Sequence, residues 1–217
     1  MNERRVTRQL TATMIEHPIM FSGPSVRALL AGRKTQSRLL ANKLRKARLQ
    51  RAGAPDSVRL TPSSWRDTNI GDRFWVRESL GWDKTGERLF YRADGAPVLA
   101  APPSGQAIRA TQLSALYMPR WASRLILTVS RVRIEPIQAM SEEDAIAEGI
   151  RRLPDGSYMA DDFDSETYPS AALVYAHRWS AFHSRPGTRW EDNPEVVVVD
   201  FTAERCDVAR DRARSSA

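Results

Sequence analysis

The chain contains little cysteine and histidine. Its 217 residues include one cysteine, Cys206, which excludes both a disulfide within the chain and a Cys-x-x-Cys metal or redox site. The three histidines show neither the His-Glu-x-x-His spacing nor another metal-ligand spacing. The His-x-Glu and Pro-Cys-x-x-Cys pattern of zinc base deaminases is absent too. We therefore expect a protein that uses no metal and no cofactor.

Long hydrophobic segments are also missing. No apolar run approaches the roughly 20 residues that cross a bilayer. The charged N-terminal segment lacks the apolar core of a signal peptide. These absences predict a cytoplasmic protein that does not enter a membrane.

Positive charge is distributed unevenly along the chain. Residues 1–60 hold 13 lysines and arginines against 3 acidic residues, whereas the remaining 157 residues hold 20 against 23. A basic segment on a near-neutral body is typical of proteins that bind a polyanion such as nucleic acid. A solubilising surface has the same composition, so charge alone leaves both interpretations open.

Hydrophobic patterning predicts short strands and short helices. Strands are expected at residues 17–21, 70–78, 88–92, 124–137 and 195–201. Helices are expected from Gly23-Pro24 to Gly32, from the Ser141–Asp144 capping box to Gly149, and over 171–182, where Val174, Trp179 and Phe182 are candidate core residues. Strands and helices do not alternate as in a βαβ series. The pattern therefore favours an α+β fold, a small mixed β-barrel of five or six strands with two or three short helices.

The length suits one domain with decorations. We expect a flexible basic lead-in over residues 1–16, a folded domain over 17–203 and a charged tail over 204–217. Within the domain, insertions are expected near residues 40–64, 94–117 and 151–170, where breaker residues or charges are dense. Such insertions suit a long polymer lying across the domain, or a partner protein.

Four sequence blocks occur in a fixed order. They are GRKTQSR at residues 32–38, GDRFWVRE at 71–78, MPRWASR at 118–124 and SEEDAIAEG at 141–149, and an Asn193-Pro194 step leads into a valine-rich last strand. Together the blocks resemble the ASCH-domain proteins of phage and prophage genomes, over roughly residues 17–201. The resemblance implies a PUA-like barrel that binds a nucleic acid or a modified nucleoside.

The resemblance also implies candidate catalytic residues. A compact bacterial enzyme of the wider superfamily hydrolyses N4-acetylcytidine with a lysine, a threonine three residues later and a glutamate on a later helix. Lys34 matches the lysine and Glu148 the glutamate, while Ser37 stands where that family has threonine. Other ASCH and PUA-like domains bind RNA, and some are described as ribonucleases. An amidohydrolase, a binding module and a ribonuclease all remain open.

Two chemical schemes suit these residues. Lys34 can activate the Ser37 hydroxyl if the turn between them is helical, because residues i and i+3 then share a face. Alternatively, Glu148 activates water while Lys34 polarises the amide carbonyl. In either scheme Arg38 or Arg120 is a candidate for holding the oxyanion.

Further residues are candidates for contact with substrate or nucleic acid. Some of them have a structural alternative. Glu78 can instead form a salt bridge with Arg38 or Arg120, and Trp121, like Trp75, can be a core residue. Tyr91 can be either a core residue or a platform on which a base stacks. The candidate contact residues are Arg33, Arg38, Glu78, Tyr91, Arg120 and Trp121. The sequence leaves the substrate and the oligomeric state open.

Overall fold

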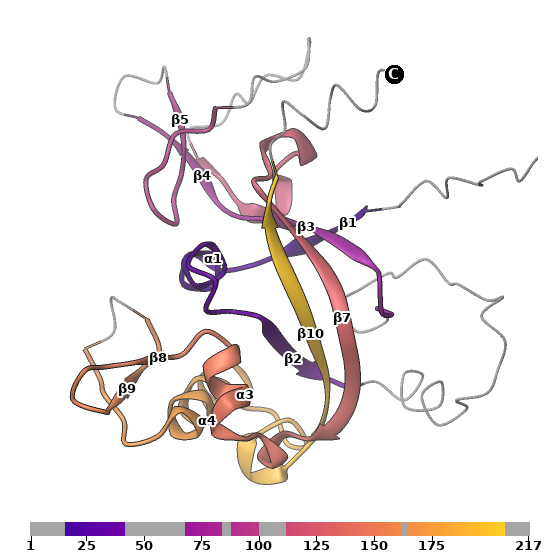
Figure 1. The fold of residues 1–217 in the computed structure, drawn as a ribbon, viewed down its shortest axis with the longest axis vertical. Helices are drawn as coiled ribbons and strands as arrows, with labels where there is room; N and C mark the ends of the chain where they lie inside the picture. Colours follow the sequence, from indigo (N-terminus) through magenta and orange to yellow (C-terminus); the bar gives the residue numbers. More distant parts are fainter. Residues whose placement is uncertain (1–15, 42–67, 84–87, 100–111, 162–164, 207–217) are drawn as a thin grey trace, which may run out of the picture.

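The computed structural model describes residues 16–41, 68–83, 88–99, 112–161 and 165–206, and its main element is a five-stranded sheet (Figure 1). Strands β1 and β3 are parallel, and every other neighbouring pair is antiparallel. In sheet order the strands are β1 (Glu16–Met20), β3 (Arg73–Arg77), β7 (Leu125–Pro136), β10 (Glu195–Arg205) and β2 (Gln36–Leu40). The fold is therefore α+β, with a mixed sheet.

The last strand, β10, is buried on both of its faces. Its four consecutive valines, 196 to 199, are each 0% exposed. Val197 and Val199 belong to a core formed with helix α1 (Gly23–Leu30), whereas Val196 and Val198 belong to a core formed with helix α4 (Ala171–Phe182). A strand covered on both faces needs apolar residues at every position, which explains the uninterrupted valine run.

A bulge changes the side-chain alternation along β7. The register between β10 and β7 shifts between Asp200 and Phe201, opposite residues 129–131 of β7. Val129 faces the core with α1 before the shift, and Val132, three residues on, packs against the same core after it. An extra residue in one strand has this effect on alternation. As a result Arg133 points to the opposite face, where it reaches Asp144.

Helix α1 connects β1 to β2 and packs its Val26 and Leu29 into the core of the curved sheet (Figure 1). The sheet order ends on β1 at one edge and β2 at the other, and these strands are not paired with each other in the described residues. The predicted closed barrel is thus not observed in that part of the chain. What is observed is an open five-stranded sheet with α1 packed against it.

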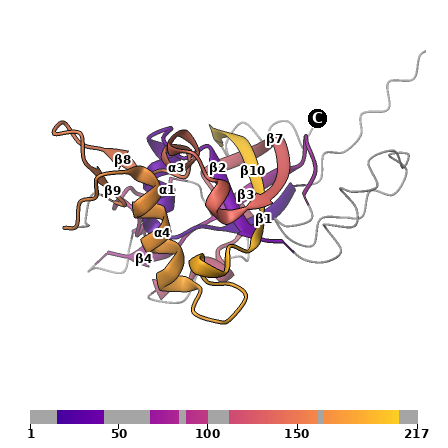
Figure 2. The same cartoon turned by 90° about the horizontal axis from the view of Figure 1, so that it is seen from below.

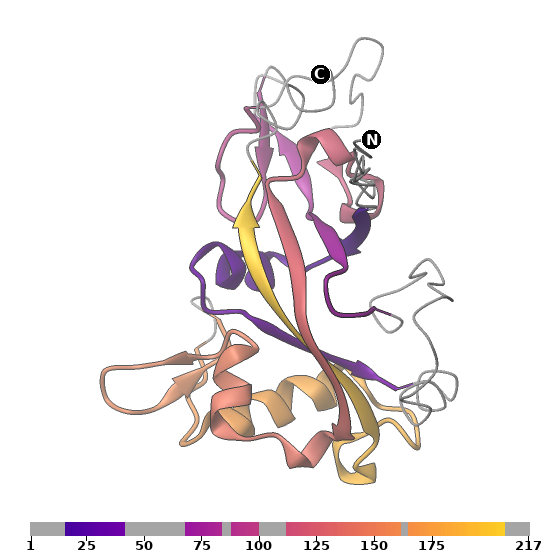
Figure 3. The same cartoon turned by 45° about the vertical axis from the view of Figure 1, so that its right-hand side comes forward.

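The long β7–β10 pair separates two groups of smaller elements (Figure 3). At one end lie α3 (Glu142–Ala147), α4 and a hairpin of β8 (Arg151–Arg152) and β9 (Tyr158–Met159); Figure 2 views them from that end. At the other end lies a three-stranded sheet of β5 (Leu89–Tyr91), β4 (Leu80–Trp82) and β6 (Gln112–Leu113). Short 3-10 turns complete the described elements: Ala115–Tyr117, Arg120–Ala122, Ile137–Ala139 and Trp190–Asp192.

The predicted helices and most predicted strands agree with these elements. The capping box is formed as expected, since the Ser141 hydroxyl accepts from the Asp144 amide and the Asp144 carboxylate accepts from the Ser141 amide. Phe182 was expected in the core, but it is 82% exposed at the end of α4. Strands β2, β4, β6, β8 and β9 were not predicted.

Several predicted segments are only partly described. Residues 1–15, 42–67, 100–111 and 207–217 lie outside the described residues, and with them the lead-in and most of the basic 40–64 insertion. No helix among the described residues is long and apolar enough to cross a membrane.

Gly149 closes α3 against the loop that precedes β2. Its φ angle is +101°, and a Cβ at this position would lie 2.9 Å from the Ala28 Cβ and 3.3 Å from the Lys34 Cβ. Both the backbone conformation and the space therefore require glycine.

We predict that Gly149→Ala lowers the free energy of unfolding by about 2–4 kcal/mol, because strain and overpacking add. Gly156→Ala is the matched control. Its φ is +89° and no atom lies within 4 Å of the added Cβ, so strain alone should cost about 1–2 kcal/mol. Urea unfolding of both variants measures the difference, and equal losses would contradict the close contact at Gly149.

Candidate active site

Lys34 and Glu148 form a buried ion pair between two segments that are far apart in the sequence. The Lys34 amide donates to the Ala28 carbonyl at the end of α1, and Glu148 is the C-cap of α3. An isolated antiparallel β-bridge pairs the backbones of Lys34 and Glu148. Beside it, the Thr35 amide donates to the Ala147 carbonyl at 2.8 Å. The end of α3 is thereby held against the start of β2.

All three ammonium donors of Lys34 are used. Its Nζ donates to the Glu148 Oε2 at 2.6 Å, to the Gln36 carbonyl at 2.9 Å and to the Glu148 carbonyl at 3.0 Å. The residue is only 4% exposed. Burial lowers the pKa of Lys34, since it penalises the charged form more than the Glu148 carboxylate favours it, and Arg178 and Arg38 lower it further.

Only one of the two Glu148 carboxylate oxygens accepts a hydrogen bond from a described residue. Oε2 accepts from Lys34, whereas Oε1 is buried and accepts no hydrogen bond from a described residue. The Arg38 Nη1 lies 3.7 Å from Oε1. Tyr175 of α4 lies beside this carboxylate; burial first, and then the charge of Glu148, raises the pKa of its phenol well above 10. A buried carboxylate oxygen with no donor is available to accept a proton.

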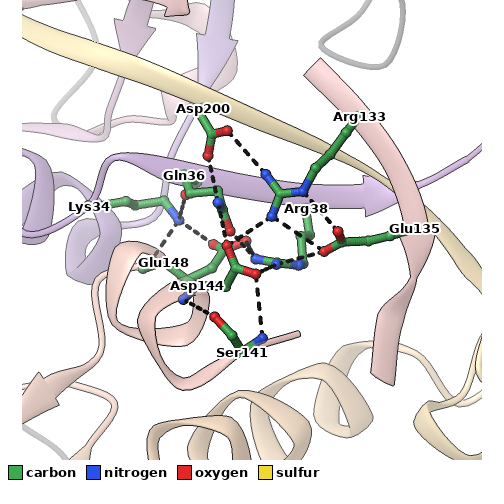
Figure 4. A network of polar contacts seen from close by, with 9 residues as sticks. All are labelled: Lys34, Gln36, Arg38, Arg133, Glu135, Ser141, Asp144, Glu148 and Asp200. Atoms are coloured by element: carbon green, nitrogen blue, oxygen red, sulfur yellow. Dashed lines mark hydrogen bonds and ion pairs between the residues drawn. The ribbon is translucent and has the colours of Figure 1, made fainter. Parts of the chain in front are cut away.

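A network of charged side chains surrounds the pair (Figure 4). Arg38, with a 0% exposed side chain, donates to the Gln36 amide oxygen and to Glu135 at 3.0 Å, and pairs with Asp144 at 3.0 Å. Arg133 bonds three carboxylates at 2.8 to 3.1 Å, and the Gln36 amide nitrogen donates to two of the same acids. The acids of the network are Glu135, Asp144, Glu148 and Asp200. They balance the buried arginines and fix their positions.

Ser37 does not share a face with Lys34. The helical turn that this pairing would require is not formed, because residues 36–40 form strand β2. Side chains alternate along a strand, so Gln36 and Arg38 face the network while Ser37 faces the other way. A Lys–Ser nucleophile pair has no support from this geometry.

Most of the other predicted contact residues lie elsewhere in the fold. Glu78 is 1% exposed and its two oxygens accept from Arg124 at 2.8 Å, so its expected pairing with Arg38 or Arg120 is wrong. Burial nonetheless raises the pKa of Glu78. Arg120 pairs with Glu16 at 2.6 Å. None of these four residues belongs to β2, α3 or α4: Glu16 is in β1, Arg120 is in the 3-10 turn Arg120–Ala122, and Glu78 and Arg124 adjoin β3 and β7.

The tryptophans 75 and 121 and Tyr91 are core residues. Trp121 is 8% exposed and Trp75 is 7% exposed. Tyr91 is 5% exposed, its hydroxyl donates to the Ala122 carbonyl at 2.8 Å, and burial raises its pKa to about 12. The Arg124 guanidinium lies 3.8 Å from the ring centroid of Tyr91. Of the candidates, only Lys34, Arg38 and Glu148 meet in one network, with the half-buried Arg33 next to Lys34 in the chain.

Sequence reasoning missed the contribution of α4. Tyr175 and Arg178 are one turn apart and therefore share a face of this helix. Arg178 is half-buried and lowers the pKa of Lys34 by charge repulsion. The helix itself was predicted, but nothing in its sequence shows which of its polar residues approach Lys34.

Comparisons with known proteins give a structural similarity alone. No family model matches the sequence, and no curated protein matches it. An ASCH domain from Lactobacillus crispatus is 16% identical, with a TM-score of 0.37 over 84% of this chain and 71% of that one. A protein from Enterococcus faecalis, of the family DUF984, is 13% identical, with a TM-score of 0.38 over 88% and 77%.

Asp144 joins the capping box of α3 to the network. Burial alone would raise its pKa, but the hydrogen bond from Gln36 and the charges of Arg38 and Arg133 outweigh it and lower the pKa below 3.8. A carboxyl with a lowered folded pKa contributes stability above its unfolded pKa, and that contribution is lost as the pH falls through the folded value.

We predict that Asp144→Asn lowers the free energy of unfolding at pH 7 by about 1–3 kcal/mol, because buried donors lose their charged acceptor. The deficit should shrink as the pH is lowered below 3.8, where the wild-type carboxyl also takes up a proton. Urea unfolding at pH 7 and pH 3 tests this. Glu143→Gln, an exposed position of the same helix, is the control and should change little at either pH. A deficit of equal size at both pH values would exclude the ionic contribution.

Proposed function

We propose that the protein is an amidohydrolase that acts on an N-acylated nucleobase or nucleoside of the N4-acetylcytidine type. One observation carries the proposal: a buried Lys34–Glu148 pair in which one carboxylate oxygen, Oε1, has no donor among the described residues. The substrate class rests on the sequence resemblance, in which these two positions match the catalytic lysine and glutamate.

The geometry favours direct attack by water over a serine nucleophile. Glu148 Oε1 takes a proton from water as the water oxygen bonds to the amide carbon, and the carbonyl π electrons move onto the carbonyl oxygen. When the intermediate collapses, the C–N bond breaks and the proton passes from Glu148 to the departing nitrogen. The products are a carboxylic acid and the free amino group of the base. Lys34 holds Oε2, which keeps Oε1 directed at the water.

The charge of Lys34 also matters for this step. The Lys34 ammonium lies 2.6 Å from Glu148 Oε2, and its three acceptors keep it in one orientation. Lys34 thus acts through Glu148 in this scheme, as a positioning residue.

We predict that Glu148→Gln and Lys34→Ala each lower kcat on N4-acetylcytidine by about 100- to 10,000-fold, the usual contribution of a general base. Ser37→Ala should stay within about two-fold of wild type, because Ser37 faces away from the network. Chromatographic separation of N4-acetylcytidine from cytidine measures the turnover.

The outcomes separate the two schemes and test the proposal. Full loss of activity in Ser37→Ala would restore the serine nucleophile. Absence of turnover by the wild type on N4-acetylcytidine and on other acylated nucleosides would exclude the proposed activity. Thermal unfolding of each variant shows whether a loss of activity reflects a loss of fold.

A binding function is the second candidate, and the charge distribution favours it. Residues 1–60 carry a large basic excess, and Arg151 and Arg152, directly after Gly149-Ile150, are both exposed. An RNA or a modified DNA that carries the reactive base would contact such residues through its phosphates. Cleavage of RNA with Glu148 as the catalytic residue is a further candidate activity on the same ligand. Loss of RNA cleavage in Glu148→Gln would assign that activity to Glu148.

We predict salt-dependent binding of a fluorescein-labelled single-stranded RNA. Raising the salt from 50 to 200 mM should weaken binding by about tenfold or more, because each phosphate contact releases counterions. Fluorescence anisotropy measures the affinity. The double variant Arg151→Gln/Arg152→Gln should reduce the slope of log K against log salt by about 1–2. Binding that is absent, or that salt leaves unchanged, would argue against a polyanion ligand.

A further inference from the structure

The Lys34–Glu148 pair is recessed within the described part of the chain. Each of its two side chains is only 5% exposed. A nucleoside that brings its acyl carbon to Glu148 Oε1 therefore needs a part of the protein to move aside. Access depends on which neighbouring segment is held weakly.

The segments that carry the pair are firmly anchored. Helix α1, before Lys34, packs Val26 and Leu29 into the core at 0% and 3% exposure. Strand β2, after Lys34, is paired with β10. Helix α3, before Glu148, has its capping box and buries Ala145 completely. Displacement of any of these elements would expose core residues to water.

The chain that follows Glu148 is held less firmly. Ile150 is buried, but no residue from Arg151 to Asp161 is buried. Hairpin β8–β9 pairs only two residues of each strand. Its Tyr158 exchanges two backbone hydrogen bonds of 2.8 Å with Tyr168, which fixes the hairpin near the start of α4. A segment with so few buried contacts opens at a low free energy.

The residues Met159–Asp161, here called the strap, run from this hairpin to α1. At one end Tyr158 is fixed by Tyr168, and Ala160 packs partly against the core with α4. At the other end the Asp161 Oδ2 accepts a hydrogen bond from the Arg27 Nη2 of α1 at 2.6 Å. The strap thus joins the α4 side of the fold to α1.

The strap and the Lys34–Glu148 pair meet α1 at neighbouring residues. A Cβ on Gly149 would lie 2.9 Å from the Ala28 Cβ and 3.3 Å from the Lys34 Cβ, so the start of this chain rests on Ala28. Arg27, the residue before Ala28, binds Asp161. The chain from Gly149 to Asp161 therefore begins and ends against α1, and the ion pair closes it beside Lys34.

The two partners of the ion pair are not equally fixed. The Arg27 Nη1 also donates to the carbonyl of Ala93 at 2.8 Å, and Ala93 belongs to the core with α1. The guanidinium therefore keeps its place when Asp161 leaves. The side chains of Arg27 and Asp161 are 20% and 16% exposed, so water and salt compete for their contact. The ion pair is the weak attachment of the strap.

We infer that the Arg27–Asp161 ion pair is a latch: while it is closed, the strap blocks the approach to Lys34 and Glu148, and its release admits substrate. The inference rests on the proposed amidohydrolase function and adds a step that precedes the chemistry. Because substrate binds only to the open form, the fraction of open molecules sets the apparent affinity.

The first test is Asp161→Asn, which removes the charge and keeps the size of the side chain. We expect kcat/KM on N4-acetylcytidine to rise about 3- to 10-fold, because more molecules are open. Raising NaCl from about 50 to about 500 mM should raise kcat/KM of the wild type about two-fold and leave Asp161→Asn unchanged, since salt screens only an ion pair that is present. The substrate is uncharged, so salt does not act on its approach.

Asp155→Asn is the matched control for this test. Asp155 is an exposed residue of the same hairpin, and its printed hydrogen bonds are with Ser157 of the hairpin turn. The same chemical change at this position should leave kcat/KM and its salt dependence as in the wild type.

A second measurement follows the strap without turnover. Ala160→Cys places a thiol in the strap, and Cys206→Ser removes the natural one. The reaction of this thiol with a chromogenic disulfide reagent should be about 3- to 10-fold faster when Asp161→Asn is added, because the open fraction is larger. Adding Asp155→Asn instead should not change the rate.

The outcomes distinguish this inference from the function on which it rests. An unchanged thiol reaction in Asp161→Asn would overturn the latch. A faster thiol reaction with an unchanged or lower kcat/KM would overturn its role in access and leave the amidohydrolase standing. Absence of turnover by every variant would remove the proposed function and the role in access, while the thiol rates would still decide whether the ion pair holds the strap. Thermal unfolding of Asp161→Asn should be close to that of the wild type.

Discussion

A lysine that is withdrawn from water has to find an acceptor for each of its three N–H groups, and the centre of this fold satisfies that demand for Lys34. The acceptors come from Gln36 at the start of β2 and from Glu148 at the end of α3, and Glu148 is 114 positions from Lys34 in the sequence. Because two of the three belong to Glu148, α3 must end against β2. Gly149 follows from the same constraint, since a side chain there would collide with Ala28 and Lys34.

The surrounding network depends on how the sheet presents its faces. Gln36 and Arg38 reach it because they alternate along β2, and Arg133 and Glu135 reach it because the bulge shifts the alternation of β7. Buried ion pairs of this kind add little net stability, since desolvation offsets the attraction between the charges. Their effect is to restrict geometry. With Arg38 and Arg133 held by several carboxylates each, Glu148 keeps one orientation relative to Lys34.

Local patterns allowed much of the fold to be predicted from the sequence. Each of these patterns extends over only a few residues: the Ser141–Asp144 capping box, the glycines at helix ends and the valine run of β10. The structure has α1, α3, α4 and β10 where the patterns predicted them. Strand β2 was not predicted because its first residues, Gln-Ser-Arg, are polar and lack a strand pattern. It forms a strand because it pairs with β10, which is far away in the sequence. The effect of Arg178 on the pKa of Lys34 could not be predicted either, because it depends on how α4 packs.

Two buried glutamates of the fold differ in how their carboxylate oxygens are satisfied. Both oxygens of Glu78 accept from Arg124, which Asp94 also binds, so neither oxygen of that carboxylate lacks a donor. Glu148 is nearly as buried, yet its Oε1 has no donor within the described residues. An acceptor left unsatisfied at such a depth costs about 1–3 kcal/mol unless a ligand or water completes it. That cost is accounted for if the oxygen receives a proton in a reaction.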